Sequence, residues 1–282
     1  MKLTSAISEI LEIKSFDGYI LKGKLTLPAG AGEISKLVIY LNGSGPKTYH
    51  IDFFPEYYAN NGIAFFSFNT RGVYEDDDPA SIKEINDEEY KTYLPSNTVE
   101  DIFHMIKTLN CIDRLKDSIV LLNGWSEGTM IAPLFAVKYP KMVSALLLCG
   151  YTNDNMRDTV TWQMNTGWVT HKDLFSAIER NDAEWVKTNY GITMEWVSEH
   201  FKLTGNRAIL PMLDLPIYIL QGKLDTQCDI NGVYEIRDTF SKLGKTNLSI
   251  YIFEKHDHCL DTEEGIADGK KKLVDIVEKI KI

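Results

Sequence analysis

One five-residue segment of the 282-residue chain has the residues of a nucleophile turn, Gly124-Trp125-Ser126-Glu127-Gly128. It fits the pattern Gly-x-Ser-x-Gly, and it stands between the apolar run 118–122 and the helical pattern 126–138. A sharp turn from a strand into a helix lifts a serine hydroxyl above the sheet, and glycines on both sides let the two backbones approach closely. The pattern therefore predicts that Ser126 attacks an acyl carbonyl.

A serine hydroxyl attacks only when a base takes its proton, and a carboxylate must orient that base. With this type of turn the three groups follow the order Ser, Asp or Glu, His along the chain. Asp225 comes just after the apolar run 215–220, so it should lie at the same edge of the sheet as Ser126. Asp229 is close enough to be an alternative acid, although its position also suits a cap for the following helix.

Two of the six histidines, His256 and His258, come just after the apolar run 248–253. We favour His258 as the base, because it lies nearer the next helix, and we keep His256 as the alternative. The carboxylate of Asp257 between them suggests a metal site as another interpretation, but the sequence shows no third ligand. The predicted chemistry needs neither a metal nor a cofactor.

Acyl transfer also needs hydrogen-bond donors for the negative oxygen that develops in the transition state. One donor should be the backbone N–H of Glu127, directly after the nucleophile. The second should come from the loop 42–46, which follows the apolar run 36–41, and we predict the N–H of Ser44. A glycine-rich loop before a helix could instead hold a phosphate, but this loop has neither the lysine of a P-loop nor the Gly-x-Gly-x-x-Gly spacing.

Short apolar runs alternate with helical patterns over most of the chain. The runs that predict strands are residues 36–41, 63–68, 118–122, 144–149, 215–220 and 248–253. The patterns that predict helices are 51–60, 99–109, 126–138, 230–240 and 261 to the C-terminus. Before them, the Asp17-Gly18 step between two alternating runs predicts an antiparallel hairpin at one edge. The fold class is therefore α/β, with a mostly parallel twisted sheet and helices on both faces.

Residues 151–211 break this alternation, because they contain no clear apolar strand and four of the five tryptophans. A structureless loop of this length is uncommon, so we predict a helical cap inserted into a core whose two parts are residues 1–150 and 212–282. Large side chains of the cap would then either contact an apolar group of the substrate or only hold the cap onto the core. The predicted substrate-binding residues are Trp125, Trp162, Met164 and Trp168.

The composition limits the classes of partner. The formal net charge of −10 repels nucleic acid and anionic membrane surfaces, so we expect neither as a partner. The N-terminus lacks a basic start followed by an apolar run, and no apolar stretch is long enough to span a bilayer. The four cysteines form no C-x-x-C pair, so we expect reduced thiols and a cytoplasmic location. The expected partner is a small acyl substrate, and the sequence leaves the oligomeric state open.

Taken together, these residues resemble the α/β-hydrolase superfamily over nearly the whole chain, and within it bacterial carboxylesterases and the catalytic domains of acyl-peptidase-like enzymes. The loop 42–46 is similar to their His-Gly-Ser-Gly-Pro oxyanion loop, and the segment 126–133 to their nucleophile helix. The segment 16–28 resembles their opening hairpin, and 69–73 their Asp/Asn-x-Arg-Gly turn. The resemblance implies a sheet of about eight strands.

The chain departs from that family pattern at several positions. Asn42 stands where these enzymes usually have histidine, and Trp125 where a histidine commonly precedes the nucleophile. The Arg-Gly turn runs into an acidic stretch, residues 74–89, in place of Gly-x-Ser. We expect a solvated charged loop there, since the spacing of an EF-hand calcium site is absent. Pro133 inside the predicted nucleophile helix should bend this helix or limit its first turns.

The sequence thus predicts a serine hydrolase that cleaves a carboxylic ester through Ser126, His258 and Asp225 and forms an acyl-enzyme. A thioesterase, amidase or peptidase of the same fold is one alternative, and an acyltransferase or lyase is another. A third is a non-catalytic binding protein of this fold, although the complete set of three catalytic residues argues against it.

Overall fold

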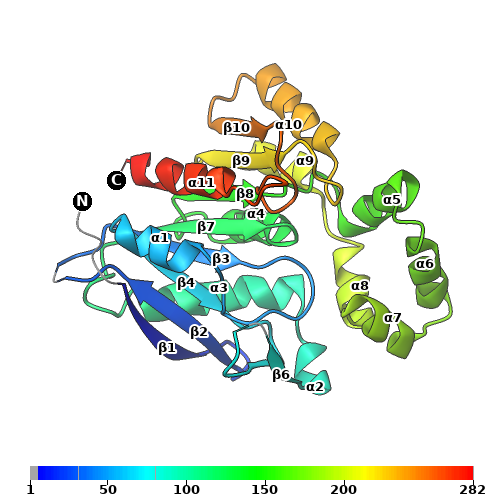
Figure 1. Ribbon diagram of the computed structural model, residues 1–282, viewed down its shortest axis with the longest axis horizontal. Helices are drawn as coiled ribbons and strands as arrows, with labels where there is room; N and C mark the ends of the chain where they lie inside the picture. Colours follow the sequence, from blue (N-terminus) through cyan, green and yellow to red (C-terminus); the bar gives the residue numbers. More distant parts are fainter. Residues whose placement is uncertain (1–5, 31, 80, 282) are drawn as a thin grey trace.

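The computed structural model describes residues 6–30, 32–79 and 81–281, and its centre is an eight-stranded sheet (Figure 1). The strands lie in the order β1-β2-β4-β3-β7-β8-β9-β10. Their bounds, in this order, are Ile7–Lys14, Ile20–Leu27, Ala64–Phe68, Lys36–Leu41, Ile119–Trp125, Ala145–Cys149, Ile217–Gly222 and Leu248–Phe253. β2 pairs antiparallel with β1 and β4, and every later pair is parallel. The parallel strands therefore end at one edge, where the predicted site residues follow β3, β7, β9 and β10.

Helices cover both faces of this sheet, because the side chains of its inner strands are apolar in both directions. In β3, for example, Leu37 and Ile39 belong to one buried cluster and Val38 to the other. The first face is covered by α3 (Pro95–Leu109), α4 (Gly128–Lys138) and α10 (Ile230–Lys242). The second face is covered by α1 (Phe54–Asn60) and α11 (Asp268–Lys279). The two helix layers therefore bury both faces of the inner strands.

The nucleophile helix α4 continues through Pro133. Proline has no N–H, so the carbonyl of Thr129, one turn earlier, loses its helical partner. The side chain of Asn206 supplies the missing donor, because its Nδ2 lies 2.9 Å from Thr129 O and 2.7 Å from Thr152 O. Asn206 is buried, so the nucleophile helix depends on a side chain that is distant in the sequence.

Replacing Asn206 with alanine should lower the free energy of unfolding by about 1–3 kcal/mol, because two buried carbonyls lose their donor. Asn189 makes a similar amide-to-carbonyl bond, to Trp185 O at 2.8 Å, but it is exposed on α7 (Ala183–Tyr190). Asn189→Ala should therefore change the stability by less than about 0.5 kcal/mol. Urea unfolding followed by circular dichroism measures both values. Equal unfolding midpoints for the two variants would contradict the role of Asn206 in α4.

In the described part of the chain, the segment between β8 and β9 contains helices and turns only. The helices are α5 (Met156–Thr166), α6 (His171–Glu179), α7, α8 (Met194–His200) and α9 (Asn206–Ile209), and the 3-10 turn Leu210–Met212 follows. Figure 1 shows α5–α8 grouped at one end of the sheet, apart from the core helices. Their apolar side chains form a separate cluster with Tyr90, Tyr93 and Met130 of the core. None of the described helices is long and apolar enough to cross a bilayer.

The acidic stretch after the Arg-Gly turn has more structure than the sequence suggested. Strands β5 (Val73–Glu75) and β6 (Ile82–Ile85) form a hairpin, and the short helix α2 (Asp87–Tyr90) follows. Glu75 pairs there with Lys22, and it also accepts a hydrogen bond from the side-chain amide of Asn69. Part of this acidic stretch is therefore tied to the core and is not a fully solvated loop.

The last helix begins at Asp268, seven residues later than the sequence pattern predicted. Residues 262–266 form a turn instead. In it the N–H of Gly265 donates to Thr262 O, and the N–H of Ile266 donates to the Thr262 hydroxyl. Gly265 has φ 74°, a conformation that ends helical geometry and that glycine adopts readily.

Candidate active site

The nucleophile turn lies between β7 and α4, and Ser126 adopts a left-handed conformation there, with φ 52°. This conformation costs on the order of 1–3 kcal/mol for a residue with a Cβ, so the surrounding structure must hold it in place. The Ser126 N–H donates to Cys149 O at 2.9 Å, and the backbone N–H and the hydroxyl of Thr129 both donate to Ser126 O. These hydrogen bonds fix the strained residue at the carboxyl end of β7.

Close backbone contacts require both glycines of the motif. A Cβ on Gly124 would lie 2.3 Å from Gly128 O, and a Cβ on Gly128 would lie 2.3 Å from Leu41 O. Gly43 also lies close to the nucleophile, because a Cβ added to it would be 3.2 Å from the Ser126 Cβ. The motif therefore brings the ends of β3 and β7 and the start of α4 together around Ser126.

Asp225 and His258 meet at the same edge of the sheet. His258 Nδ1 donates to Asp225 Oδ2 at 2.7 Å, and Gln221 Nε2 donates to the same oxygen at 2.7 Å. The other oxygen, Oδ1, accepts the backbone N–H groups of Gln227 at 2.7 Å and Cys228 at 2.9 Å. The carboxylate is thus fixed by four donors, and it sets the imidazole tautomer with the proton on Nδ1. Nε2 is then the ring nitrogen that can act as a base.

The environment of His258 favours its protonated form. Burial disfavours the charged imidazolium, but the hydrogen bond with Asp225, the nearby Cys228 side chain and the negative charge of Asp225 together outweigh burial and raise the pKa of His258 above its ordinary value. Gly150, with φ 60°, lies against the imidazole, where a Cβ would be 2.6 Å from His258 Cε1. The ring is therefore held between the carboxylate on one side and the backbone of Gly150 on another.

The structure separates the alternatives that the sequence left open. Asp229 caps α10, where its carboxylate accepts the N–H of Asn231 at 3.0 Å. His256 Nε2 bonds to Asp268, at the start of α11. Asp225 and His258 are thus the acid and the histidine that face each other, while each alternative residue has a separate structural partner.

A cavity of about 610 Å³ lies over the nucleophile turn, and both Ser126 and His258 line it. The hydrogen bonds of the described residues do not include one between Ser126 Oγ and the imidazole, and catalytic hydrogen bonds are often long before substrate binds. Several walls of the cavity are aromatic, and the rings belong to Tyr40 and Trp125 of the core and to Trp168, Tyr190, Trp196 and Phe201 of the inserted segment. The cavity therefore lies between the core and the inserted helices.

Two of the four residues predicted to bind substrate, Trp125 and Trp168, line this cavity. Trp162 lines a separate cavity of about 100 Å³, and Met164 lines neither of the two. This corrects the sequence-based expectation for Trp162 and Met164. Neighbouring residues of a helix point in different directions, and only the docked position of α5 decides which of them reach the cavity.

The cavity also has polar walls that the sequence did not suggest. His171 lies with its Nε2 2.9 Å from Gln163 Oε1 and its Nδ1 2.8 Å from the Tyr190 hydroxyl. Gln163 Nε2 donates to Gln227 O at 2.6 Å, which ties the inserted helices to the loop after β9. Among the described residues that line the cavity there is no aspartate or glutamate, and Lys47 is the one lysine. The cavity thus suits a neutral or anionic ligand with an apolar portion.

The two predicted oxyanion donors have free backbone N–H groups. In the described structure neither the N–H of Ser44 nor that of Glu127 donates to another backbone group. Asn42, Gly43 and Ser44 line the cavity next to Ser126. The N–H of Gly43 has no backbone acceptor there either, and the closeness of Gly43 to the nucleophile makes it a rival to Ser44 that the sequence did not suggest. The identity of the second donor stays a prediction.

Asp225, Cys228 and His258 are also the residue types that bind metals, and their ligand atoms lie within 4.8 Å of one another. However, His258 Nδ1 and Asp225 Oδ2 are already hydrogen-bonded to each other. The other carboxylate oxygen, Oδ1, accepts two backbone N–H groups. The arrangement therefore fits a hydrogen-bonded acid–base pair better than a set of metal ligands. All four cysteines are free thiols, and Cys228 is buried beside the pair.

No protein-family model matches the sequence, and no curated protein matches it, whereas solved structures do. A carboxyl esterase from Bacillus coagulans is similar over 97% of this chain and 98% of its own, with 16% identity and a TM-score of 0.69. An esterase from Exiguobacterium antarcticum is similar over 94% and 97%, with 17% identity and a TM-score of 0.60. An acylaminoacyl peptidase from Pyrococcus horikoshii is similar over 98% of this chain, with 16% identity and a TM-score of 0.66, but this chain spans only 41% of that protein. As the sequence resemblance implied, the chain has the α/β-hydrolase fold.

Proposed function

We propose that the chain is a serine hydrolase that cleaves carboxylic esters through Ser126, His258 and Asp225. The observation that carries this proposal is the 2.7 Å hydrogen bond between His258 Nδ1 and Asp225 Oδ2 at the edge where the strained Ser126 lines the cavity. The three residues follow three different strands. Their meeting at one edge of the sheet is explained if they act in one reaction, and would otherwise be a coincidence. The esterases among the similar structures agree with the proposal, although their identity to this chain is too low to carry it.

In the proposed reaction the Ser126 hydroxyl attacks the ester carbonyl, and His258 Nε2 takes its proton. Asp225 holds the proton on Nδ1 and stabilises the imidazolium that forms. The N–H of Glu127, with that of Ser44 or Gly43, donates to the tetrahedral oxyanion. The imidazolium then protonates the leaving alcohol, and the acyl group remains on Ser126. Water, activated by the same imidazole, releases the acid and restores the serine.

A fluorophosphonate probe tests this proposal directly. We expect the purified protein to hydrolyse p-nitrophenyl acetate and butyrate, and to lose this activity in proportion to phosphonylation of one serine, which mass spectrometry locates at Ser126. Thioesters, anilides and peptides in the same assay separate esterase from thioesterase, amidase and peptidase, and a competing alcohol reveals acyl transfer. A folded protein with neither turnover nor label would instead favour the non-catalytic binding protein.

Replacing Trp168 with alanine should lower kcat/KM for p-nitrophenyl butyrate by about 5- to 30-fold, which corresponds to about 1–2 kcal/mol of lost apolar contact. The loss should be smaller for acetate, because a shorter acyl chain has less surface to bury. Trp162→Ala is the matched control, since Trp162 lies on the same inserted segment but does not line the main cavity. Equal losses for the two variants would mean that Trp168 supports the inserted helices and does not contact the acyl chain.

A further inference from the structure

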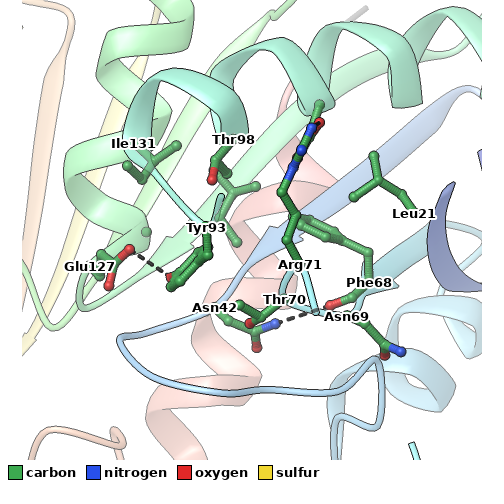
Figure 2. Close-up of a pocket in the computed structure, with 13 residues that line it drawn as sticks. Leu21, Asn42, Phe68, Asn69, Thr70, Arg71, Tyr93, Thr98, Glu127 and Ile131 are labelled. Atoms are coloured by element: carbon green, nitrogen blue, oxygen red, sulfur yellow. Dashed lines mark hydrogen bonds and ion pairs between the residues drawn. The ribbon is translucent and has the colours of Figure 1, made fainter. Parts of the chain in front are cut away.

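The side chain of Glu127, directly after the nucleophile, is buried and does not line the catalytic cavity. Only 2% of its surface is exposed. Figure 2 shows the carboxylate directed at the Tyr93 hydroxyl, beside a small internal void of about 20 Å³ that is separate from the catalytic cavity. A buried carboxylate is unfavourable unless it is paired and hydrogen-bonded, so its partners show what this one does.

The partners of Glu127 come from three other parts of the chain. The Tyr93 hydroxyl donates to Oε1 at 2.6 Å, from the turn before α3. The indole N–H of Trp196 donates to Oε2 at 3.2 Å, and His200 Nε2 lies 3.0 Å from Oε1. Trp196 and His200 both belong to α8 of the inserted segment. The hydroxyl of Ser44, in the predicted oxyanion loop, also lowers the pKa of this carboxyl group.

Glu127 and His200 form a close, buried pair. His200 Nδ1 lies 3.1 Å from Trp196 O, which can only accept, so Nδ1 must carry a proton. Nε2 then faces a carboxylate oxygen, and two lone pairs would repel each other unless a proton lies between them. Burial alone would raise the pKa of Glu127, but His200 and the hydroxyls of Tyr93 and Ser44 lower it below its ordinary value. The buried pair therefore favours a negatively charged carboxylate at Glu127.

The His200 ring is fixed in this position by the helix that carries it. Its ring stacks on the indole of Trp196, with centroids 3.9 Å apart and planes inclined by 24°. His200 is completely buried, and its side chain has no exposed surface. The 3.0 Å contact at Nε2 lacks the geometry of a hydrogen bond, because the ring nitrogen is not aligned with an acceptor among the described residues. Trp196 and His200, both on α8, thus each contact Glu127, the residue that follows the nucleophile.

We propose that Glu127 is a positioning residue, whose carboxylate ties the nucleophile turn to helix α8, so that docking of α8 sets the geometry of the transition-state site. The turn carries one side of the oxyanion hole, because the backbone N–H of Glu127 itself is a predicted oxyanion donor. This inference rests on the proposed hydrolase function. Positioning errors of about 1 Å can lower a rate about 100-fold, so a carboxylate that links these elements has a large effect without touching the substrate.

Glu127→Ala should therefore lower kcat for p-nitrophenyl butyrate by about 100-fold and leave KM within about 3-fold. His200→Ala removes one of the two α8 contacts and should lower kcat by about 10-fold or more, again with little change in KM. Glu127→Gln should restore kcat to within about 5-fold of the wild type. Its amide oxygen can accept from Trp196 while its NH₂ group donates to a neutral His200, so the same elements stay joined.

Val186→Ala is the control for a general loosening of the inserted helices. Val186 is completely buried in the same cluster as Trp196, but it does not line the catalytic cavity. This variant should lower the thermal stability and keep kcat within about 2-fold of the wild type. A loss of kcat in Val186→Ala that equals the loss in Glu127→Ala would overturn the proposal, and so would a wild-type kcat in Glu127→Ala. A change confined to KM would do the same.

Two further measurements keep the test decisive. If Glu127→Ala does not fold, Trp196→Phe removes the indole N–H that binds Glu127, together with part of a ring that also lines the catalytic cavity, and an unchanged kcat in that variant overturns the proposal. Hydrogen exchange by mass spectrometry over residues 194–200 does not depend on turnover. It should show faster exchange in Glu127→Ala and near-wild-type exchange in Glu127→Gln, and equal protection in all three proteins overturns the link to α8. Wild-type protein that hydrolyses no ester would instead contradict the proposed function, while the exchange data still test the link.

Discussion

Replacing Ser126 with alanine should lower kcat/KM for p-nitrophenyl butyrate by about 10⁴-fold or more, because the nucleophile of the acyl-enzyme is removed. Phosphonylation by a fluorophosphonate should disappear at the same time. Stopped-flow or steady-state release of p-nitrophenol measures the first effect, and intact-mass spectrometry measures the second. The residual rate of hydrolysis in Ser126→Ala should be that of an enzyme that still binds the ester but has no nucleophile to attack it.

Two companion variants make this result specific. Ser241→Ala removes an exposed serine of α10 and should leave both turnover and labelling unchanged. Ser126→Gly should be as inactive as Ser126→Ala, yet more stable than the wild type, because glycine adopts φ 52° without the strain that a Cβ imposes. Turnover that survives in Ser126→Ala, with a label on another serine, would transfer the nucleophile to that residue.

Asp225→Asn should lower kcat by about 10⁴-fold, because it reverses the histidine tautomer. The backbone N–H groups of Gln227 and Cys228 require an oxygen at the Oδ1 position, so the new amide must place its NH₂ group at the Oδ2 position. That NH₂ group would face His258 Nδ1, which must then accept and give up its proton. The remaining proton moves to Nε2, the nitrogen that should take the proton of Ser126.

The pH profile provides an independent check of the same pair. His258 must be neutral to act as a base, and Asp225 raises its pKa, so wild-type activity should rise with pH through a value above the ordinary histidine pKa of about 6.5. In Asp225→Asn the charge that stabilises the imidazolium is gone, and the acidic limb of the residual activity should move to lower pH. Asp229→Asn is the control, because Asp229 caps α10. Near-wild-type activity in Asp225→Asn with a loss in Asp229→Asn would show that the acid is misassigned.

Much of the fold and the pairing of Asp225 with His258 could be predicted, because both depend on local sequence patterns. The order of the strands in the sheet then brings the residues that follow them together. An apolar run in this chain marks a strand covered on both faces, and the residue just after such a run lies at the carboxyl edge. Asp225 and His258 are predictable in this way, although 33 residues separate them in the sequence. The choice of His258 over His256 rested on a weaker positional argument, and the bond from His256 to Asp268 gives it a structural reason.

The features that could not be predicted depend on how the inserted helices dock. The sequence gives no sign that Trp168 reaches the cavity while Trp162, six residues earlier, does not. The pairing of Glu127 with His200 joins residues 73 apart through a contact that exists only when α8 lies against the core. The late start of α11 was missed for a different reason, because a turn closed by Thr262 and Gly265 competes locally with the helix. Both kinds of feature depend on physical factors that act only in the folded chain: the docked orientation of helices and the competition of a turn with a helix.

The amide of Asn206 has a consequence for any exchange of the inserted helices of this protein for those of a relative. Helix α9 lies on the inserted side of β9, yet its first residue completes the hydrogen bonding of α4 around Pro133. A graft that replaces the whole segment between β8 and β9 would remove this donor and weaken the helix that follows the nucleophile. A transplantable unit should therefore end before Gly205, with α9 kept as part of the recipient scaffold.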